Sequence, residues 1–436
     1  MIVGIDDTDS RKGMCTTYLC AVLVDELKTY GEVSTPCLVR LNPCIPFKTR
    51  GNGAVSFEIS IEKEEIEEEV KEIVKTRVRA LSELNDEGTN PGVVFIGDSD
   101  NSNTISTNEK ERLQYFYESA VREVLTLEDA YAIITDLEFD YFGLKTKRGL
   151  IGALAAVSFF VLQRYHYYDF TYELITYRRR ERRGKARIID ELSVWEADAA
   201  TYPLTWDTVD VANNKIVFAP HSPCPVLFGI RGDSLAAIYR AYELIHAESE
   251  ERKMLFITNQ GTDYHLIPLD VATKMSDYHS YILDGVVRSN PQTVEGGHVV
   301  FSISLSDSGT IECIAYEPTK GFRAIIRKLR VGDVIRVYGS QKKGTVNLEK
   351  IELTQLNYEE ERNPRCDKCG RSMASAGRLQ GYRCKRCGAY CADKAVVTVN
   401  RELEEGLYES PPVARRHLAK PLIRMRDTGK HIHPSR

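Results

Sequence analysis

Apolar residues recur along the first 265 positions at spacings that predict alternating strands and helices. The apolar run at 2–5 predicts a short strand, and the helix after it is indicated by Leu19, Val22, Leu23 and Leu27. Further strands are predicted at 55–61, 93–96 and 170–177, and further helices at 66–84, 108–124 and 149–163. Residues 216–265 again predict strand, helix and strand.

The pattern changes after residue 282. Five strands are predicted near 283–288, 298–305, 310–316, 334–339 and 345–353, with a helix near 320–329 between the third and the fourth. Five strands with a helix in that position are typical of an OB barrel. The chain is therefore predicted to be a multidomain α+β protein with an OB fold in its second half.

Composition narrows the class of protein. The chain has 436 residues, 42% hydrophobic and 28% charged, as in ordinary globular proteins, and its length suggests about three domains. No apolar run approaches the roughly 20 residues of a membrane span. The N-terminus reaches Asp6 without a basic and then apolar segment, so we expect no secretion signal. We expect a cytoplasmic protein, in which the eleven cysteines stay reduced.

The charge is unevenly distributed. The net charge is −5, yet residues 361–436 carry 17 Lys and Arg against 8 Asp and Glu. A basic C-terminal module on an acidic body suggests a polyanionic partner. A second basic run, 178–187, has seven basic residues in ten; it fits a solvated linker and a phosphate-backbone contact equally well.

Two Cys-x-x-Cys pairs predict a zinc ribbon. Cys366 and Cys369 are followed after fourteen residues by Cys384 and Cys387. Four thiolates complete a tetrahedron and leave no open position, so the zinc should be structural. Cys391 is interpreted as a spare thiol. The basic side chains beside the pairs, together with an OB barrel, favour single-stranded or loop nucleic acid as the partner.

The N-terminal motif indicates phosphate chemistry. Asp6, Asp7 and Asp9 lie at the end of a predicted strand, where three carboxylates favour a hard cation such as Mg²⁺. The turn at Gly13 leads into a helix whose first residues, Thr16 and Thr17, can present hydroxyls and N–H groups to an anion. The alternative interpretation is an Asp-rich turn with a capping threonine.

A second motif, Lys48-Thr-Arg50-Gly51-Asn52-Gly53, precedes the strand at 55–61. Its cations and glycines can grip a polyphosphate, although a simple hairpin turn has the same composition. The segment 145–149, at the head of the 149–163 helix, has the same ambiguity.

Four segments together closely resemble the archaeal tRNA(Ile) 2-agmatinylcytidine synthetases: Gly4–Ser10, Gly13–Thr17, Lys48–Gly53 and Lys147–Ala153. The resemblance covers essentially the whole chain. It implies a kinase-like catalytic domain at 1–108, a ferredoxin-like domain at 109–187, an OB fold at 283–357, a zinc ribbon at 358–400 and a basic tail at 401–436. Residues 188–282 are expected to complete the catalytic domain; the alternative is that they belong to the ferredoxin-like unit.

The resemblance implies an ATP-dependent ligase with ATP, Mg²⁺ and Zn²⁺. Its substrate would be an isoleucine tRNA with a CAU anticodon. The enzyme would phosphorylate the carbon-2 carbonyl of the wobble cytidine, and the primary amine of agmatine would displace the phosphate. The product would pair with adenosine and decode AUA. The family also implies release of AMP and phosphates, and phosphorylation of a threonine, which by position is Thr16 or Thr17.

Residue roles are assigned from the chemistry of the residues together with the resemblance. Asp6, Asp7, Asp9, Thr16 and Thr17 would be catalytic. ATP would be bound by Gly13, Lys48, Arg50, Gly51, Asn52 and Gly53. RNA would be contacted by Lys147, Arg148, Arg179, Arg182, Lys385 and Arg386. Agmatine, a dication, is assigned to the segment containing Asn259, Gln260, Thr262 and Asp263.

Two competing hypotheses remain open on sequence. One is a non-enzymatic OB and zinc-ribbon protein that only binds single-stranded nucleic acid, and it requires no aspartate cluster. The other is an ATP-dependent RNA ligase or nucleotidyl transferase, which needs a nucleophilic lysine. The chain has no Lys-x-Asp-Gly motif, so this hypothesis ranks third.

Overall fold

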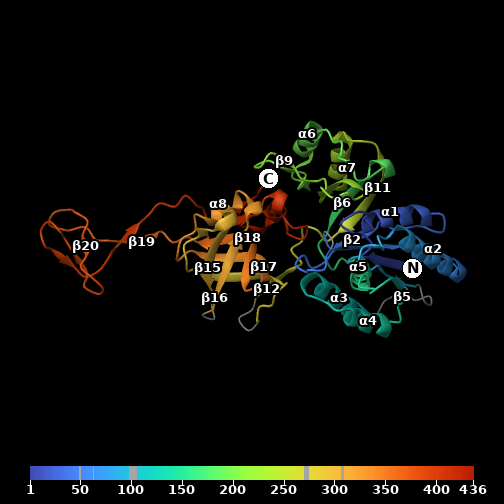
Figure 1. The fold of residues 1–436 in the computed structure, drawn as a ribbon, viewed down its shortest axis with the longest axis horizontal. Helices are drawn as coiled ribbons and strands as arrows, with labels where there is room; N and C mark the ends of the chain where they lie inside the picture. The colour runs from blue at the N-terminus through green and yellow to red at the C-terminus, as the bar shows by residue number, and fades with distance from the viewer. Residues whose placement is uncertain (49–50, 62, 98–105, 270–273, 306–308) are drawn as a thin grey trace.

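The computed structural model describes residues 1–48, 51–61, 63–97, 106–269, 274–305 and 309–436. A large α/β body contains the N-terminus, a barrel lies beside it, and a small module extends beyond the barrel at the far end of the molecule (Figure 1). The C-terminus returns to the region between the barrel and the α/β body (Figure 1).

One nine-stranded sheet organises the α/β body. Its order is β5-β4-β1-β3-β2-β11-β6-β10-β7. The strands are β1 (Ile2–Asp6), β2 (Cys37–Arg40), β3 (Gly53–Glu58), β4 (Gly92–Ile96), β5 (Asp140–Gly143), β6 (Thr171–Arg178), β7 (Thr205–Trp206), β10 (Val226–Gly232) and β11 (Glu250–Thr258). The pairing of β2 with β11 is parallel and joins the strands of residues 1–143 to those of 171–258. A short hairpin, β8 (Val209–Asp210) and β9 (Lys215–Ile216), lies off this sheet.

Helices cover both faces of the sheet. Helices α1 (Thr16–Leu27) and α2 (Glu64–Leu81) bury apolar stripes in one core with β1 and β3. The other core contains α3 (Thr107–Arg122), α4 (Leu127–Asp136) and α5 (Leu150–Gln163). Helix α5 is apolar on all sides because it lies between the sheet and α3. Capping boxes begin α3 at Ser106 and α4 at Thr126. Helices α6 (Glu191–Thr201) and α7 (Leu235–Leu244) cover β10.

The predicted five-stranded barrel is confirmed. Strands β13 (Ser280–Val287), β15 (Val299–Ser304), β16 (Thr310–Ala315), β18 (Thr345–Gln355) and β17 (Val334–Lys342) close on one another through the β13–β17 pairing. Helix α8 (Phe322–Ile326) lies between the third and fourth of them in sequence, as expected. Two short strands, β12 (Leu266–Pro268) and β14 (Gln292–Thr293), pair at its edges.

The ribbon and the tail complete the chain. Strands β19 (Glu359–Arg362) and β23 (Ala395–Thr398) form a stalk, and β20 (Ala374–Ser375), β21 (Tyr382–Arg383) and β22 (Tyr390–Cys391) form the ribbon sheet. After the ribbon, β24 (Gly406–Glu409) joins the barrel beside β18, and β25 (Ile432–His433) pairs in parallel with β24.

Most predicted elements are present, with differences at their ends. The strand predicted at 55–61 ends at Glu58, and the helix predicted to Leu84 ends at Leu81. Strands β2 and β5 and helices α4 and α6 were not predicted, because their short apolar runs acquire a partner only in the folded protein. In the described part of the chain, no helix is both long and apolar enough to cross a membrane. The predicted domain boundaries stay predictions.

Candidate active site

A cavity of about 760 Å³ lies where β1 ends, and distant parts of the chain line it. They include the N-terminal motif, the segment around Lys48–Gly53, the strands β6 and β10, and the tail that follows the ribbon. Ten residues predicted from the sequence as site residues line this cavity: Asp6, Asp7, Asp9, Thr16, Thr17, Lys48, Gly51, Asn52, Gly53 and Arg148. The tertiary structure therefore brings the predicted catalytic and ATP-binding motifs together.

The aspartate cluster is held against the start of α5. Asp6 is the last residue of β1, and Asp7 turns the chain with a positive φ of 58°. The backbone of Asp6 passes so close to Gly149 that a Cβ there would lie 2.6 Å from the Asp6 carbonyl oxygen. Arg148, the residue before it, donates from Nη2 to Oδ2 of Asp7 at 3.1 Å. The Lys147–Ala153 motif thus serves the same cavity as the N-terminal motif.

The carboxyl groups in this cluster are electrostatically strained. Burial raises the pKa of Asp6 well above its usual value, and the neighbouring Asp7 and Asp9 carboxylates raise it further. Burial also raises the pKa of Asp7, although Arg148 opposes that shift. Adjacent partly buried carboxylates favour either a proton or a cation. Their oxygen donors are the type that Mg²⁺ prefers.

Thr16 and Thr17 begin helix α1 and are both buried. Thr8 donates its hydroxyl to Oγ1 of Thr16 at 3.0 Å, and Oγ1 of Thr17 lies 3.0 Å from Sγ of Cys15. Both hydroxyls sit at a helix N-terminus that faces the cavity, where anionic oxygen is favoured.

Cations line another part of the cavity. Arg40 and Arg231 flank the buried Glu173, with nitrogen–oxygen distances of 3.7 and 3.2 Å. Burial raises the pKa of Glu173, but the two arginines outweigh it and the net shift is downward. Burial lowers the pKa of Lys48. This arrangement of cations around a cavity suits a polyphosphate.

The tail supplies residues that the sequence reasoning missed. Arg415 and His417 line the cavity, although they follow the ribbon by more than ten positions. Arg415 is ion-paired with Asp207 and, at 2.8 Å, with Glu409. Burial and the nearby Arg40, Arg231 and Lys48 lower the pKa of His417 well below its usual value, so this ring is neutral. The available sequence signal is the basic triplet at 415–417, which does not stand out from the rest of the basic tail.

Several predicted residues lie away from the cavity. Gly13 is outside its lining, and its carbonyl accepts from the Ser10 amide. Lys147 points toward the Tyr141 ring. Arg182 is paired with Glu248, whereas the predicted RNA contacts Arg179, Lys385 and Arg386 are exposed. Arg50 lies outside the described residues.

The predicted agmatine segment lies in the protein interior. Asn259, Gln260, Thr262 and Asp263 do not line the cavity. The Asn259 amide bonds the Arg40 backbone, and the Thr262 hydroxyl donates to the Asn259 carbonyl. Asp263 pairs with Lys350. Gln260 bonds a side chain of the cavity lining, because its Nε2 donates to Oε2 of Glu173 at 2.5 Å.

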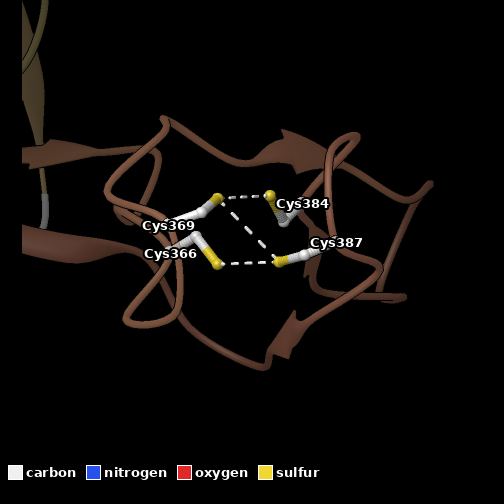
Figure 2. A group of neighbouring side chains, drawn as sticks. All are labelled: Cys366, Cys369, Cys384 and Cys387. Carbon is white, nitrogen blue, oxygen red and sulfur yellow. Dashed lines mark hydrogen bonds between the residues drawn. The ribbon is translucent and has the colours of Figure 1, made fainter.

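The four predicted zinc ligands converge (Figure 2). Sγ of Cys366 lies 3.3 Å from that of Cys387, and Sγ of Cys369 lies 3.4 Å from that of Cys384. Thiolates at such separations fit the four corners of one tetrahedral zinc site. The Cys391 side chain is outside this group and contacts the Asp393 carbonyl instead.

Comparisons with known proteins match parts of the chain that line the cavity as well as the ribbon. Residues 2–146 match the model of the TiaS TCKD domain, 147–265 that of the TiaS FLD domain, and 363–403 that of the TiaS C-terminal zinc ribbon domain. The chain is 48% identical to the tRNA(Ile2) 2-agmatinylcytidine synthetase TiaS of Methanosarcina mazei, with full coverage of both proteins. It is 46% identical to that of Archaeoglobus fulgidus over 99% of each chain.

Solved structures give the same match. The crystal structure of a TiaS–tRNA(Ile2)–ATP complex has a TM-score of 0.87, with 45% identity over 99% of both chains. A TiaS–tRNA(Ile2)–AMPCPP–agmatine complex has a TM-score of 0.85, with 43% identity over 99% of this chain and 98% of that one.

Proposed function

The chain belongs to the tRNA(Ile2) 2-agmatinylcytidine synthetase family, and we propose how its own residues carry out that reaction. It is an ATP-dependent enzyme that forms a carbon–nitrogen bond between agmatine and the wobble cytidine of tRNA(Ile2). The hypothesis of a protein that only binds nucleic acid is therefore excluded. One observation supports this assignment of roles. The aspartate cluster, the threonines that begin α1 and the cations Arg40, Lys48 and Arg231 all line one cavity.

Phosphorylation is the proposed activating step. The carbon-2 carbonyl oxygen of cytidine is a poor leaving group, and transfer of a phosphoryl group from ATP converts it into a good one. The amine of agmatine then attacks carbon 2, and the carbon–oxygen bond breaks as phosphate leaves with the oxygen. Arg40, Lys48 and Arg231 would offset the charge of the transferred group.

Asp6, Asp7 and Asp9 fit Mg²⁺, since three carboxylates lie together on this cavity and burial raises the pKa of Asp6 and of Asp7. When bound there, Mg²⁺ would neutralise phosphate oxygens during transfer. Carboxylate oxygens of the cluster that do not hold the ion would be free to orient the group that attacks ATP. Arg148 would keep Asp7 ionised through the 3.1 Å contact.

The family trait of a phosphorylated threonine is assigned here to Thr16 or Thr17, because both residues line the cavity. Valine keeps the shape of threonine and removes only its hydroxyl. Incubation of Thr16→Val and Thr17→Val with γ-labelled ATP, followed by mass spectrometry of the peptide 13–27, identifies the acceptor as the residue whose loss abolishes labelling.

Agmatine is expected near Glu173. The segment Asn259–Asp263 would act through Gln260, whose amide holds this carboxylate at 2.5 Å. The change Gln260→Met should raise the KM for agmatine and leave the KM for tRNA unchanged. Equal changes in both would place agmatine elsewhere.

RNA contacts are proposed for the exposed cations Arg179, Lys385 and Arg386. Lys147 and Arg182 instead contact Tyr141 and Glu248 within the protein. The kinase-like and ferredoxin-like names for the two parts of the α/β body, the domain limits given above and a cytoplasmic location also stay proposals.

A turnover assay tests the function. The protein is incubated with ATP, Mg²⁺, agmatine and a CAU-anticodon tRNA(Ile2) transcript, and the nucleosides are weighed after digestion. We expect a cytidine heavier by agmatine minus water, absent with Asp7→Asn. Unmodified cytidine despite tight tRNA binding would overturn the assignment, and full activity of Asp7→Asn would overturn the proposed role of the cluster.

A further inference from the structure

A second group of metal-ligating side chains lies in the C-terminal tail, on the barrel and apart from the ribbon. Glu404, His431 and His433 each offer one ligand atom, and these three atoms lie within 4.8 Å of one another. His431 comes just before strand β25 and His433 ends it, and their ring centroids lie 4.5 Å apart, so the two side chains are on the same side. Glu404 comes just before β24, the strand with which β25 pairs.

The His433 ring is held in one position. It stacks on Tyr408 with ring centroids 4.1 Å apart and planes 7° apart, and its centroid is 4.5 Å from that of His431. The ring also hydrogen-bonds the backbone of Glu405. Backbone contacts of this kind orient metal-ligating histidines and fix their tautomer.

The Nε2 atom of His433 is buried and has no hydrogen-bond partner among the described residues. Gly406 leaves space beside this nitrogen because it has no side chain. A Cβ on Gly406 would lie 3.1 Å from the nitrogen and 2.8 Å from the His431 carbonyl oxygen. Gly406 also has a φ of 138°, which side chains rarely allow. An unpartnered nitrogen lone pair beside a second imidazole and a carboxylate is a set of side chains able to bind a metal ion.

We propose that Glu404, His431 and His433 bind a divalent transition-metal ion, with Zn²⁺ the best fit. Two imidazoles and one carboxylate suit zinc, and the fourth position would be taken by water. The hard ions Mg²⁺ and Ca²⁺ are disfavoured because two of the three ligands are nitrogen.

The ion would hold the C-terminal residues 431–436 in place near the cavity. Just beyond His433, the Ser435 amide donates to Oε1 of Glu409 at 3.0 Å. The same carboxylate oxygen lies 2.8 Å from Nη2 of Arg415, which lines the catalytic cavity. A cation at the histidines would therefore stabilise the tail segment that supplies Arg415 and His417.

Cobalt binding tests the proposal in the full-length protein with its ribbon zinc in place. Co²⁺ is titrated and followed by visible absorption, because a site of nitrogen and oxygen ligands gives d–d bands without the thiolate charge-transfer bands of a ribbon. We expect one added equivalent per chain, displaced by Zn²⁺. Its affinity should fall by roughly tenfold or more in His431→Gln, His433→Gln and Glu404→Gln, since each change removes a ligand.

His166→Gln is the matched control, because this exposed histidine lies on the α/β body outside the cluster. Circular dichroism confirms that each variant is folded. The proposal is overturned if no equivalent binds beyond the ribbon's own, or if the added equivalent binds all three variants as tightly as the parent protein. Loss of binding in His166→Gln as well would equally contradict it.

Discussion

Gly152 and Asp6 are packed so closely that a Cβ on Gly152 would lie 1.9 Å from Oδ2 of Asp6. Any other residue at position 152 must displace the Asp6 carboxylate from the cavity or push α5 away from β1. The glycine near the end of the Lys147–Ala153 motif is therefore explained by its contact with the aspartate cluster near the N-terminus of the chain.

Gly152→Ala should abolish most of the modification activity, because the side chain moves Asp6 from its position. A displaced catalytic group costs on the order of 100-fold in rate. Steady-state kinetics with tRNA and agmatine measure the loss. Gly321→Ala is the matched control, since a Cβ there meets nothing within 4 Å and the residue has helical backbone angles. Full activity of Gly152→Ala would contradict the packing argument.

Asp6→Asn should make the protein more stable and inactive. The folded-state pKa of Asp6 is raised, so the folded protein binds more protons than the unfolded chain between the ordinary and the raised value. The free energy of unfolding therefore falls as pH rises through this window. At pH 7 the charge of the Asp6 carboxylate destabilises the folded protein. Asparagine removes the charge, and each 1 kcal/mol gained raises Tm by about 2–4 °C.

The matched measurement is thermal unfolding of both proteins at pH 5 and pH 7 without Mg²⁺. The gain from Asp6→Asn should be larger at pH 7. A gain that is equal at both pH values, or a loss of stability, would show that the carboxylate is not strained.

Arg148→Gln should move the acidic limb of the pH–rate profile to higher pH. Arg148 opposes the burial that raises the pKa of Asp7, so its removal lets that pKa rise further and leaves less ionised Asp7 at a given pH. The profile of kcat/KM against pH measures the shift. Arg112→Gln, which breaks an arginine–aspartate pair with Asp136 away from the cavity, should leave the profile unchanged.

Arg415→Met should destabilise the protein by about 3 kcal/mol or more, because it leaves Asp207 and Glu409 buried without their cation. Urea unfolding provides the measurement. Arg362→Met breaks only an exposed pair with Glu360 and should cost less than about 1 kcal/mol. If the two changes cost the same, the tail is not an integral part of the fold.

Cys369→Ser should remove the ribbon zinc and weaken tRNA binding, whereas Cys391→Ser should do neither. Only the first cysteine belongs to the four-sulfur group. Metal analysis after dialysis and tRNA binding at fixed salt measure both effects. Loss of zinc from Cys391→Ser would mean that the fifth thiol is a ligand.

The chemistry of the site could be predicted from the sequence because it is concentrated in short motifs. Asp6, Asp7 and Asp9 follow a strand by local pattern alone, and the spacing of Cys366, Cys369, Cys384 and Cys387 is itself the ligand geometry. The five barrel strands were also recognisable, since alternating burial leaves a period of two in the sequence.

The residues that complete the cavity were not predictable in the same way. Glu173 and Arg231 belong to strands whose sequence pattern predicts only core strands. They line the cavity because β11 pairs with β2 and so joins the two halves of the sheet. His417 follows the ribbon in sequence, and the tail must return past the barrel before it meets Arg40. The polar composition of the segment 259–263 suggests a ligand site, yet its side chains bond to the protein interior.

The sequence by itself determined the family and the reaction class through the resemblance of four short motifs, and it predicted the four-cysteine group and the aspartate cluster, because each of these motifs is local in the chain. Only the tertiary structure decided which distant residues face that cluster, that Gly152 makes room for Asp6, and that the tail forms part of the cavity wall. The physical reason is that contacts between remote segments depend on strand order and packing, which local residue spacing does not encode.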